Sequence, residues 1–598
     1  MTIRTSTMTS NLGDFTTDHS VLKLSGLALV IGAMSAGVAG GLIWLIHLFT
    51  NLAYFQRFAV ADVTPAESHL GVWAVGIPVV GGLIIGLMAR YGSEKIRGHG
   101  IPEALEAILI GRSRMSPRVA LLKPLSSAIS IGTGGPFGAE GPIIMTGGAL
   151  GSLLAQLFHF SSIERRILLA AGAAAGMAAI FNTPVAAVLL AIELLLFEWK
   201  PRSFIPVAAA AAMAAMLRVP LLGAGPMFVT PSHAALGLDG MGWALGVGLV
   251  AGVGAGLASL MVYGFEDLFH KLPIHWMWWP AIGGLFVGLG GLIDPRVLGV
   301  GYDLIGDLLH GVPLSGALIG LLLVKAFVWA IALGSGTSGG VLAPLLIIGG
   351  AMGAVEAGFI PVGDAGLWAL VGMAAMMAGT MRAPFTAILF ALELTHDQNT
   401  LPLLLVTCMA SVAVTVLFMR RSILTEKVAR RGYHIAYEYG VDPIQARLVR
   451  EVMDHNPATV PDNMPVSELA LLIAKGDPHL GRRQGTPIVD DAGRLVGIIT
   501  REDVLLALEE PTRGDMTVAQ AGQRDLIVTY PDESLSVAVT KMLRNNIGRL
   551  PVVSRSDPTR LEGYLGRAGI MKARLHGLEE EELRERSWQR RSRREPMS

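Results

Sequence analysis

Apolar residues dominate the chain from about residue 21 to about residue 424, and polar residues dominate the remaining C-terminal part. The first apolar run, 21–48, is longer than the roughly 18 residues that a helix needs to cross a bilayer. No small-residue cleavage site comes after it, so the pattern predicts a retained spanning helix rather than a signal peptide. After Arg420, short Val, Ile and Leu runs alternate with charged residues. The pattern therefore predicts an all-α polytopic membrane domain followed by a soluble α/β domain.

The membrane part is not built from uniform spans, because Gly and Pro interrupt many of its apolar segments. In lipid, broken helices are tolerated only where the freed backbone groups are buried in protein or line a cavity. Such interruptions therefore indicate a transporter or a channel. The predicted parts are a polar segment at 1–20, a transmembrane domain at 21–424 with repeats at about 21–220 and 235–424, a linker at 425–448, two related soluble units at about 449–510 and 514–572, and a charged tail at 573–598.

Composition narrows the class further. Of the 598 residues, 52% are hydrophobic and 16% are charged, whereas a soluble chain carries about 25% charged residues. A secreted enzyme, a disordered chain and a disulfide scaffold are thereby excluded, and the single cysteine, Cys408, allows no intrachain disulfide. The formal net charge is zero, so bulk charge gives no reason to expect a nucleic-acid partner.

The two halves of the membrane part resemble each other. Residues 132–142 match residues 334–344 at a shift of 202, and residues 184–193 match residues 384–393 at a shift of 200. Duplicated halves of transporters usually meet at a pseudo-two-fold axis, with the substrate between them near the midplane. The sequence leaves open whether the two halves are inverted or parallel.

The matched segments combine a Gly-rich break with a proline at or near the start of a new helix. Proline suits the first helical turn, and glycine lets the backbone approach an ion closely. The unpaired N–H groups of that turn, with the helix dipole, form an anion site without a full positive charge. A third such turn is at 98–102, and its weaker counterpart is at 299–302. Three or four helix starts are therefore expected to converge on one anion.

Glu140 stands at the start of one of these predicted helices. A carboxylate in a membrane domain is costly and indicates function by default. Its negative charge suits the same N–H groups that would bind an anion. We therefore interpret Glu140 as a tethered competitor that leaves when it is protonated. A plain helix-start glutamate, stabilised by the dipole, is the structural alternative.

These motifs resemble those of the CLC family of chloride channels and chloride/proton antiporters. The matching motifs are GHGIP at 98–102, GAEGP at 138–142, GGVLAP at 339–344, and the duplicated segments at 181–193 and 381–393. The resemblance implies a homodimer with one anion pathway per subunit, built from inverted repeats of broken and tilted helices. It implies that Glu140 is the gate, and that the anion-binding positions are His99, Gly100, Ile101, Ala139, Gly141, Val341, Leu342 and Leu424.

Three of these positions depart from the usual family pattern. His99 stands where a serine hydroxyl is common, and an imidazole donates one N–H when neutral and adds charge when protonated. We expect His99 to line the pathway and to make transport depend on pH near about 6 to 7. Leu424 replaces a tyrosine, which leaves the inner constriction apolar or wider. Leu342 replaces a phenylalanine, but its backbone contribution would survive.

A fourth departure concerns the transport mechanism. Family antiporters often carry an inner glutamate directly after the position of Glu193, and this chain has Leu194 there. Either Glu193 or water carries the proton instead, or the protein conducts anions passively. Because Glu393 occupies the matching place in the second repeat, a shared structural role is the alternative for Glu193.

The soluble part reads as two related α/β units that look like a tandem pair of CBS domains, often attached to CLC proteins on the cytoplasmic side. In such pairs the Thr and Asp of a G-x-x-T-x-x-D turn contact the ribose and phosphate of an adenosine nucleotide, and Thr500 and Asp503 fit this pattern. The second unit has Gly566 and Gly569 instead. A dimerisation module without a ligand is the alternative.

The sequence therefore predicts a dimeric anion transport protein of the inner membrane, with chloride as the anion and a cytoplasmic regulatory tail. Its expected partners are chloride or a similar monovalent anion, protons if it is an antiporter, membrane lipid and a second copy of the chain. No required cofactor, metal site or enzymatic activity is expected, and an adenine nucleotide is the candidate ligand of the tail. The alternative function is a CBS-regulated magnesium-type channel, which would need clustered carboxylates in its pathway.

Overall fold

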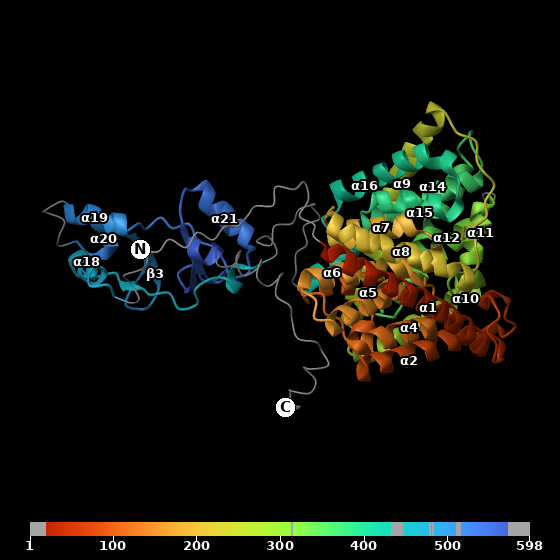
Figure 1. Ribbon diagram of the computed structural model, residues 1–598, viewed down its shortest axis with the longest axis horizontal. Coiled ribbons are helices and arrows are strands. Elements are labelled where there is room, and N and C mark those ends of the chain that lie inside the picture. Colours follow the sequence, from red (N-terminus) through yellow and green to blue (C-terminus); the bar gives the residue numbers. More distant parts are fainter. Residues whose placement is uncertain are drawn as a thin grey trace. The chain divides into compact units, whose positions relative to one another are not determined.

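A computed structural model of the chain describes residues 19–312, 315–431, 447–477, 480, 484–509 and 516–571. Residues 1–18 of the predicted polar segment and the predicted tail at 573–598 lie outside the described residues. The described residues form two compact units, one made of residues up to 431 and the other of residues from 447 on (Figure 1).

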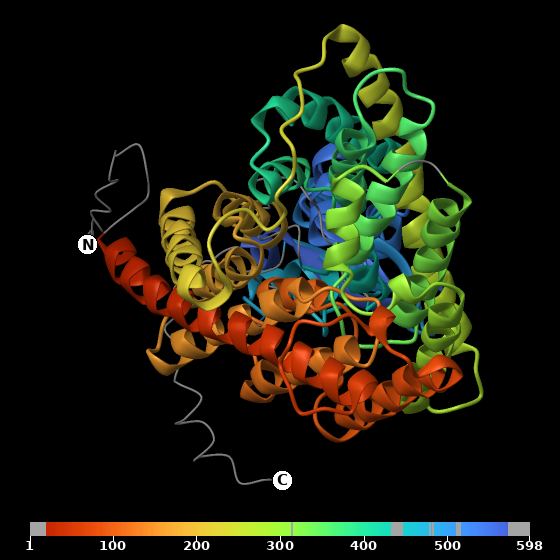
Figure 2. The same ribbon diagram turned by 90° about the vertical axis from the view of Figure 1, so that its right-hand side faces the viewer.

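The first unit is helical. Seven of its described helices are long and apolar enough to cross a membrane, judged by length and composition. Shorter apolar helices lie among them, as the broken segments of the sequence predict. The long red helix in Figure 2 is α1. The helices are α1 (Ser20–Phe55), α2 (Gly76–Tyr91), α3 (Ile101–Leu109), α4 (Pro117–Gly132), α5 (Glu140–Leu157), α6 (Ser162–Phe181), α7 (Pro184–Leu190), α8 (Pro201–Leu222), α9 (Leu238–His270), α10 (Trp279–Ile293), α11 (Tyr302–Leu309), α12 (Gly316–Gly334), α13 (Leu342–Ala357), α14 (Ala365–Met381), α15 (Pro384–Thr395), α16 (Leu401–Phe418) and α17 (Ile423–Arg430).

The duplication seen in the sequence extends to the packing. Helices α1 to α8 correspond in order to α9 to α16, and equivalent pairs pack alike: α1 on α8 and α9 on α16, α5 on α6 and α13 on α14. Counterparts also meet across the two halves, because α2 packs on α10 and α7 packs on α15. This is the arrangement expected of repeats that are related by a two-fold axis.

Glycine allows the closest helix pair of each half to form. A Cβ on Gly172 would meet the carbonyl oxygen of Gly147, and a Cβ on Gly147 would meet that of Gly172. Gly349 and Gly372 face each other in the same way in the second half. Small residues let membrane helices approach to backbone contact, which gains packing energy where no hydrophobic driving force exists between helices.

The last helix of this unit, α17, covers residues that the sequence assigns to the start of a linker. Ser422 caps it: the Thr425 N–H donates to the Ser422 hydroxyl at 3.3 Å, and the Ser422 N–H donates to the Thr425 hydroxyl at 3.0 Å. The Tyr263 hydroxyl of α9 also donates to the carbonyl oxygen of Ile423. These contacts hold the start of the helix against the membrane unit.

The second unit contains two similar halves. In the first half β2 and β3 are antiparallel, and β1 runs parallel to β2. In the second half β4 and β5 form an antiparallel pair, and both hairpins have an irregular register at the equivalent place, between Ile488 and Val489 and between Val552 and Val553. The elements are β1 (Val460–Pro461), α18 (Val466–Ala474), β2 (Gly485–Val489), β3 (Leu495–Thr500), α19 (Arg501–Glu509), α20 (Val518–Ala521), α21 (Leu535–Arg544), β4 (Arg549–Val553) and β5 (Leu561–Gly566).

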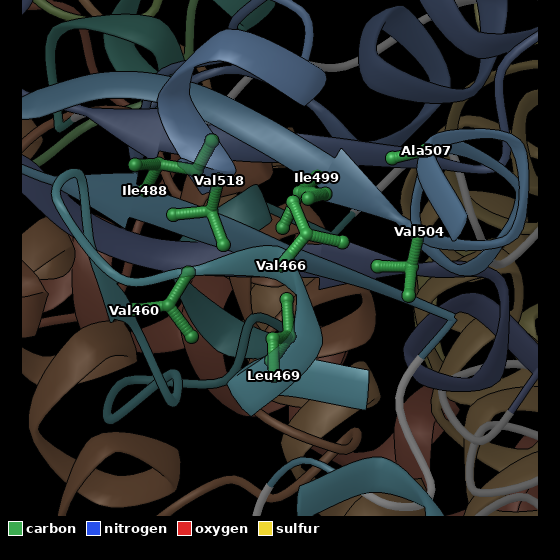
Figure 3. Close-up of a cluster of buried hydrophobic side chains, with 8 residues drawn as sticks. All are labelled: Val460, Val466, Leu469, Ile488, Ile499, Val504, Ala507 and Val518. Atoms are coloured by element: carbon green, nitrogen blue, oxygen red, sulfur yellow. The ribbon is translucent and has the colours of Figure 1, made fainter. Parts of the chain in front are cut away.

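Each half of the second unit has its own apolar core. Figure 3 shows the first core, in which side chains of three strands and three helices point toward one another. The second core is built from α21, β4 and β5 around Leu535, Leu550 and Leu565, all fully buried. The two halves are joined by the Tyr564 hydroxyl, which donates to the carbonyl oxygen of Gly485 at 2.9 Å.

The glycine contacts lead to a stability prediction. Gly172→Ala should destabilise the membrane unit by about 1–3 kcal/mol, because the new methyl group overpacks the contact with Gly147. The measurement is the thermal unfolding midpoint of the purified protein in detergent.

Gly40→Ala on α1 is the matched control, because a Cβ at Gly40 would have no neighbour within 4 Å. That variant should be neutral or slightly more stable, since alanine is the better helix former. Equal midpoints for the two variants would contradict the role given to the glycine contact.

Candidate functional site

Backbone hydrogen bonds join the three Gly-rich turns of the membrane unit. The Gly98 N–H donates to the carbonyl oxygen of Thr337 at 3.2 Å. Gly138 and Gly340 exchange two N–H···O bonds of 3.2 and 2.9 Å. Since turns more than 200 positions apart are linked in this way, the structure brings together the starts of α3, α5 and α13.

Glu140 lies at the centre of this junction and is completely buried. Its Oε1 accepts hydrogen bonds from the backbone N–H groups of Leu342 and, at 3.3 Å, Ala343, in the first turn of α13. Its Oε2 is buried without a hydrogen-bond partner among the described residues. A carboxylate thus occupies the N–H groups that the sequence assigns to an anion.

The Glu140 carboxylate contacts one of the two amide positions of α13 that are predicted to bind the anion, and also the residue after it. The sequence predicts Val341 and Leu342, whereas the Glu140 carboxylate accepts from Leu342 and Ala343. Val341 is the N-cap residue of α13, so Leu342 and Ala343 are the first two residues of the helix. The N–H groups of these positions have no partner within the helix.

In the first motif, at 98–102, one of the predicted anion donors already forms a hydrogen bond within the protein. Gly100 is the N-cap of α3 and has a positive φ of 90°, which glycine adopts without strain. Its N–H donates to Oε2 of Glu103 at 3.1 Å, so the predicted anion donor at Gly100 already has a partner. Ile101 begins the helix and is fully buried.

Gly141 and Ala139 frame Glu140 on the α5 side. A Cβ on Gly141 would meet the carbonyl oxygen of His99, so the first and second motifs are in backbone contact. Ala139 is the N-cap residue of α5 and is fully buried. Both predicted positions therefore lie at the junction of the turns.

His99 is buried in the first motif, with 2% of its surface exposed. Its Nδ1 has no hydrogen-bond partner in the described part of the chain. The Lys123 ammonium group lies beside this turn and donates to the carbonyl oxygens of Ile96 at 2.8 Å and Gly98 at 2.6 Å. The pH dependence expected from His99 stays a prediction.

Leu424 lies in the first turn of α17 and is fully buried. Leu424 stands where the family pattern has a tyrosine and therefore offers no hydroxyl. The hydroxyl of Tyr263 does not take this role, because it donates to the carbonyl oxygen of Ile423.

Glu193 and Glu393 cap each other's repeat. Both oxygens of Glu193 accept backbone N–H groups at the start of α15, from Phe385 at 3.3 Å and Thr386 at 2.8 Å. The Thr386 hydroxyl adds a third hydrogen bond of 2.6 Å. In return, Glu393 accepts from the N–H groups of Val185 at 3.0 Å and Ala186 at 2.8 Å, at the start of α7.

The Glu193 side chain comes from a π-helical segment, Ala191–Leu196, that continues α7. Glu193 of the first repeat thus caps α15 of the second repeat, just as Glu393 caps α7. Leu194, which stands where family antiporters often carry an inner glutamate, is fully buried.

Comparison with known proteins supports the same family. The sequence profile described as voltage gated chloride channel matches residues 81–416, more than half of the chain. The chain belongs to the voltage-gated chloride channel (CLC) family. The profile of the CBS domain matches twice in the soluble unit, at 449–510 and 518–576, which confirms the predicted tandem pair.

The CLC relatives include both channels and exchangers. The voltage-gated ClC-type chloride channel ClcB of Citrobacter koseri is 30% identical over 416 residues, which cover 67% of this chain and 98% of ClcB. The H⁺/Cl⁻ exchange transporter ClcA of the same organism is 29% identical over 407 residues, or 64% of this chain and 85% of ClcA. A solved structure of a slow cyanobacterial Cl⁻/H⁺ antiporter has the same fold, with a TM-score of 0.62, 24% identity, and coverage of 69% of this chain and 98% of that one.

In this CLC chain, ion pairs tie α17 to the first motif. Glu103, which accepts from Gly100, also faces the Lys427 ammonium group at 3.6 Å and the Arg431 guanidinium at 3.2 Å. Arg430 pairs with Asp267 of α9. The helix that leads toward the CBS pair is thus bonded to the turn that carries His99.

In the CBS pair, Thr500 and Asp503 lie together where β3 ends and α19 begins. The N–H and the hydroxyl of Thr500 both donate to Oδ2 of Asp503 at 2.7 Å, and the Asp503 N–H donates to the Thr500 hydroxyl at 3.2 Å. The two residues that are predicted to bind a nucleotide therefore form hydrogen bonds to each other in this structure. In the second CBS domain, β5 ends at Gly566.

The reciprocal caps lead to a second prediction. Glu193→Ala and Glu393→Ala should each lower the free energy of unfolding by about 1–3 kcal/mol, because each leaves buried N–H groups without an acceptor. Thermal unfolding in detergent measures the loss.

Glu140→Ala is the control for this comparison. It should cost less stability in chloride buffer, because an anion can replace the carboxylate at the N–H groups of α13. If Glu393→Ala lost stability while Glu193→Ala remained as stable as the unmodified protein, the idea that each glutamate caps a helix of the other repeat would be contradicted.

Proposed function

We propose that this protein transports chloride across the membrane and that Glu140 is its gate. The observation that carries the proposal is the hydrogen bonding of the Glu140 carboxylate to the first turn of α13. A helix start with unpaired N–H groups binds an anion, and the carboxylate holds that place while the pathway is closed. Chloride is the anion named for the relatives ClcB and ClcA.

Partial charges suit transport better than a full charge would. A site that conducts must bind its ion well enough for entry and weakly enough for exit. The N–H groups of α13 provide such an intermediate attraction, and the tethered carboxylate returns when the anion leaves. A magnesium-type channel is not favoured, because the described residues hold no cluster of three or more metal-binding side chains.

One observation favours passive conduction over proton exchange. Glu193 is the glutamate next to the place of the missing inner proton carrier, and both of its oxygens accept hydrogen bonds from α15. A carboxylate used as a helix cap is poorly placed to carry protons. We therefore propose passive chloride conduction, with Glu140 as a gate alone.

Four further features belong to the same proposal. The protein is a homodimer with one pathway per subunit. It lies in the inner membrane, and its CBS pair is on the cytoplasmic side. Its transport domain consists of residues 21–424. The large apolar side chains exposed on its helices, such as Leu257 and Leu323, suit contact with lipid. The family to which the chain belongs consists of transport proteins, and the proposal includes no enzymatic activity.

The transport proposal is tested in liposomes that hold high internal chloride, with equal pH on both sides and a potassium ionophore to balance charge. We expect chloride to leave without uptake of protons. Glu140→Ala should retain the chloride flux and make it at least as fast, because the competitor is gone. External chloride and external pH are recorded together.

Two results would contradict parts of this proposal. Proton uptake that accompanies chloride exit, and that is lost in Glu140→Ala, would identify an antiporter whose proton route bypasses Leu194. An absence of chloride flux from both proteins would contradict chloride transport itself.

We also propose that the first CBS domain binds an adenine nucleotide at Thr500 and Asp503. Thr500 and Asp503 lie at the start of α19, where the helix dipole favours a phosphate. Calorimetry of the full-length protein with ATP, ADP and AMP should show binding that Asp503→Ala removes. Absence of heat with all three nucleotides would leave a structural role for the CBS pair.

A further inference from the structure

Among the described residues, Tyr302 places a buried and unpaired hydroxyl next to the gate. It is the first residue of α11, after Gly301, whose positive φ of 76° turns the chain into the helix. The hydroxyl oxygen is buried and has no hydrogen-bond partner in the described part of the chain. Buried polar atoms without a partner are uncommon, and each needs an explanation.

Two polar groups of the site act on this hydroxyl. It lies within electrostatic range of the Glu140 carboxylate, and the backbone N–H of Ala139 faces it. Oε2 of Glu140 is also buried without a partner. Two buried groups without a partner among the described residues, one able to donate and the other to accept, therefore lie within electrostatic range of each other.

Aromatic packing holds the Tyr302 ring in place. Phe181 and Phe228 meet it edge to face, with centroid distances of 6.2 and 6.5 Å. Such contacts fix the ring and so fix the direction of the hydroxyl. The ring belongs to an apolar environment, in which a hydrogen bond to a carboxylate is stronger than in water.

We propose that the Tyr302 hydroxyl receives the Glu140 carboxylate when an anion displaces it from α13. In the displaced position the hydroxyl donates to the carboxylate, which satisfies both atoms that are unpaired in this structure. Tyr302 is thus a positioning residue of the gate: it acts on the anion through Glu140. This inference rests on the proposed role of Glu140 and deepens it, because it specifies where the carboxylate goes.

Chloride binding measured by calorimetry on the full-length protein tests the inference. Tyr302→Phe keeps the ring and its contacts but removes the donor. Displacement of Glu140 then loses a hydrogen bond to a charged group, so chloride should bind about tenfold more weakly. Tyr91→Phe, which removes an exposed hydroxyl at the end of α2, is the matched control and should bind chloride as the unmodified protein does.

Tyr302→Phe in a Glu140→Ala background shows whether Tyr302 acts through the Glu140 carboxylate or on the anion directly. Glu140→Ala should bind chloride more tightly than the unmodified protein, and adding Tyr302→Phe should then change the affinity by less than about twofold, because no carboxylate remains to be received. Normal binding by this double variant also shows that the substituted protein is folded.

Two results would overturn the inference and leave the gate proposal standing. One is an unchanged chloride affinity of Tyr302→Phe alone, while Glu140→Ala still binds more tightly. The other is an equal loss of affinity in both backgrounds, which would mean that Tyr302 contacts the anion directly. Absence of chloride binding by every variant, including Glu140→Ala, would instead contradict the proposed function, and the inference with it.

Discussion

The N–H groups in the first turn of α13 impose the constraint on which the site depends. They lie in a buried junction, where an unpaired donor is costly, and the partial positive charge of a helix start favours an anion or a carboxylate as their acceptor. In this structure that acceptor is the Glu140 carboxylate. The backbone bonds between Gly138 and Gly340 hold the two turns at the distance that makes this contact. Under the proposed function, the Glu140 carboxylate and the transported anion compete for the same donors.

Carboxylates accept N–H groups at helix starts in three places of this protein, but with different numbers of bonds. Glu193 and Glu393 also accept N–H groups at helix starts, but each carboxylate uses both oxygens, and the Thr386 hydroxyl adds a third bond to Glu193. Glu140 uses one oxygen, and its other oxygen has no partner among the described residues. Glu193 and Glu393 are therefore bonded through both oxygens, whereas Glu140 is bonded through one, as suits the gate proposed above. The duplicated sequence makes both kinds of contact available at the interface between the halves.

Glu103 connects the anion junction to the rest of the chain. Its carboxylate caps Gly100 on one side and pairs with Lys427 and Arg431 on the other. In the sequence, α17 is the last described helix before the CBS pair, and Glu103 bonds to residues at both ends of this contact: Gly100 in the first motif and Lys427 in α17. Breaking a buried pair by removing one partner is costly, so α17 and the first motif are expected to move together.

The sequence by itself determined the membrane class, the duplication, the Gly-rich turns and the place of Glu140 at the start of a broken helix, because these depend on local pattern and spacing. It also predicted the CLC family and the CBS pair, which the comparisons confirm. Only the tertiary structure decided which groups each carboxylate contacts: Glu140 meets a helix 202 positions away, and Glu193 caps a helix of the other repeat. It also paired Gly100 with Glu103 and placed the Tyr302 hydroxyl within electrostatic range of Glu140. Local periodicity carries no information about such long-range partners, since they depend on how the two halves pack.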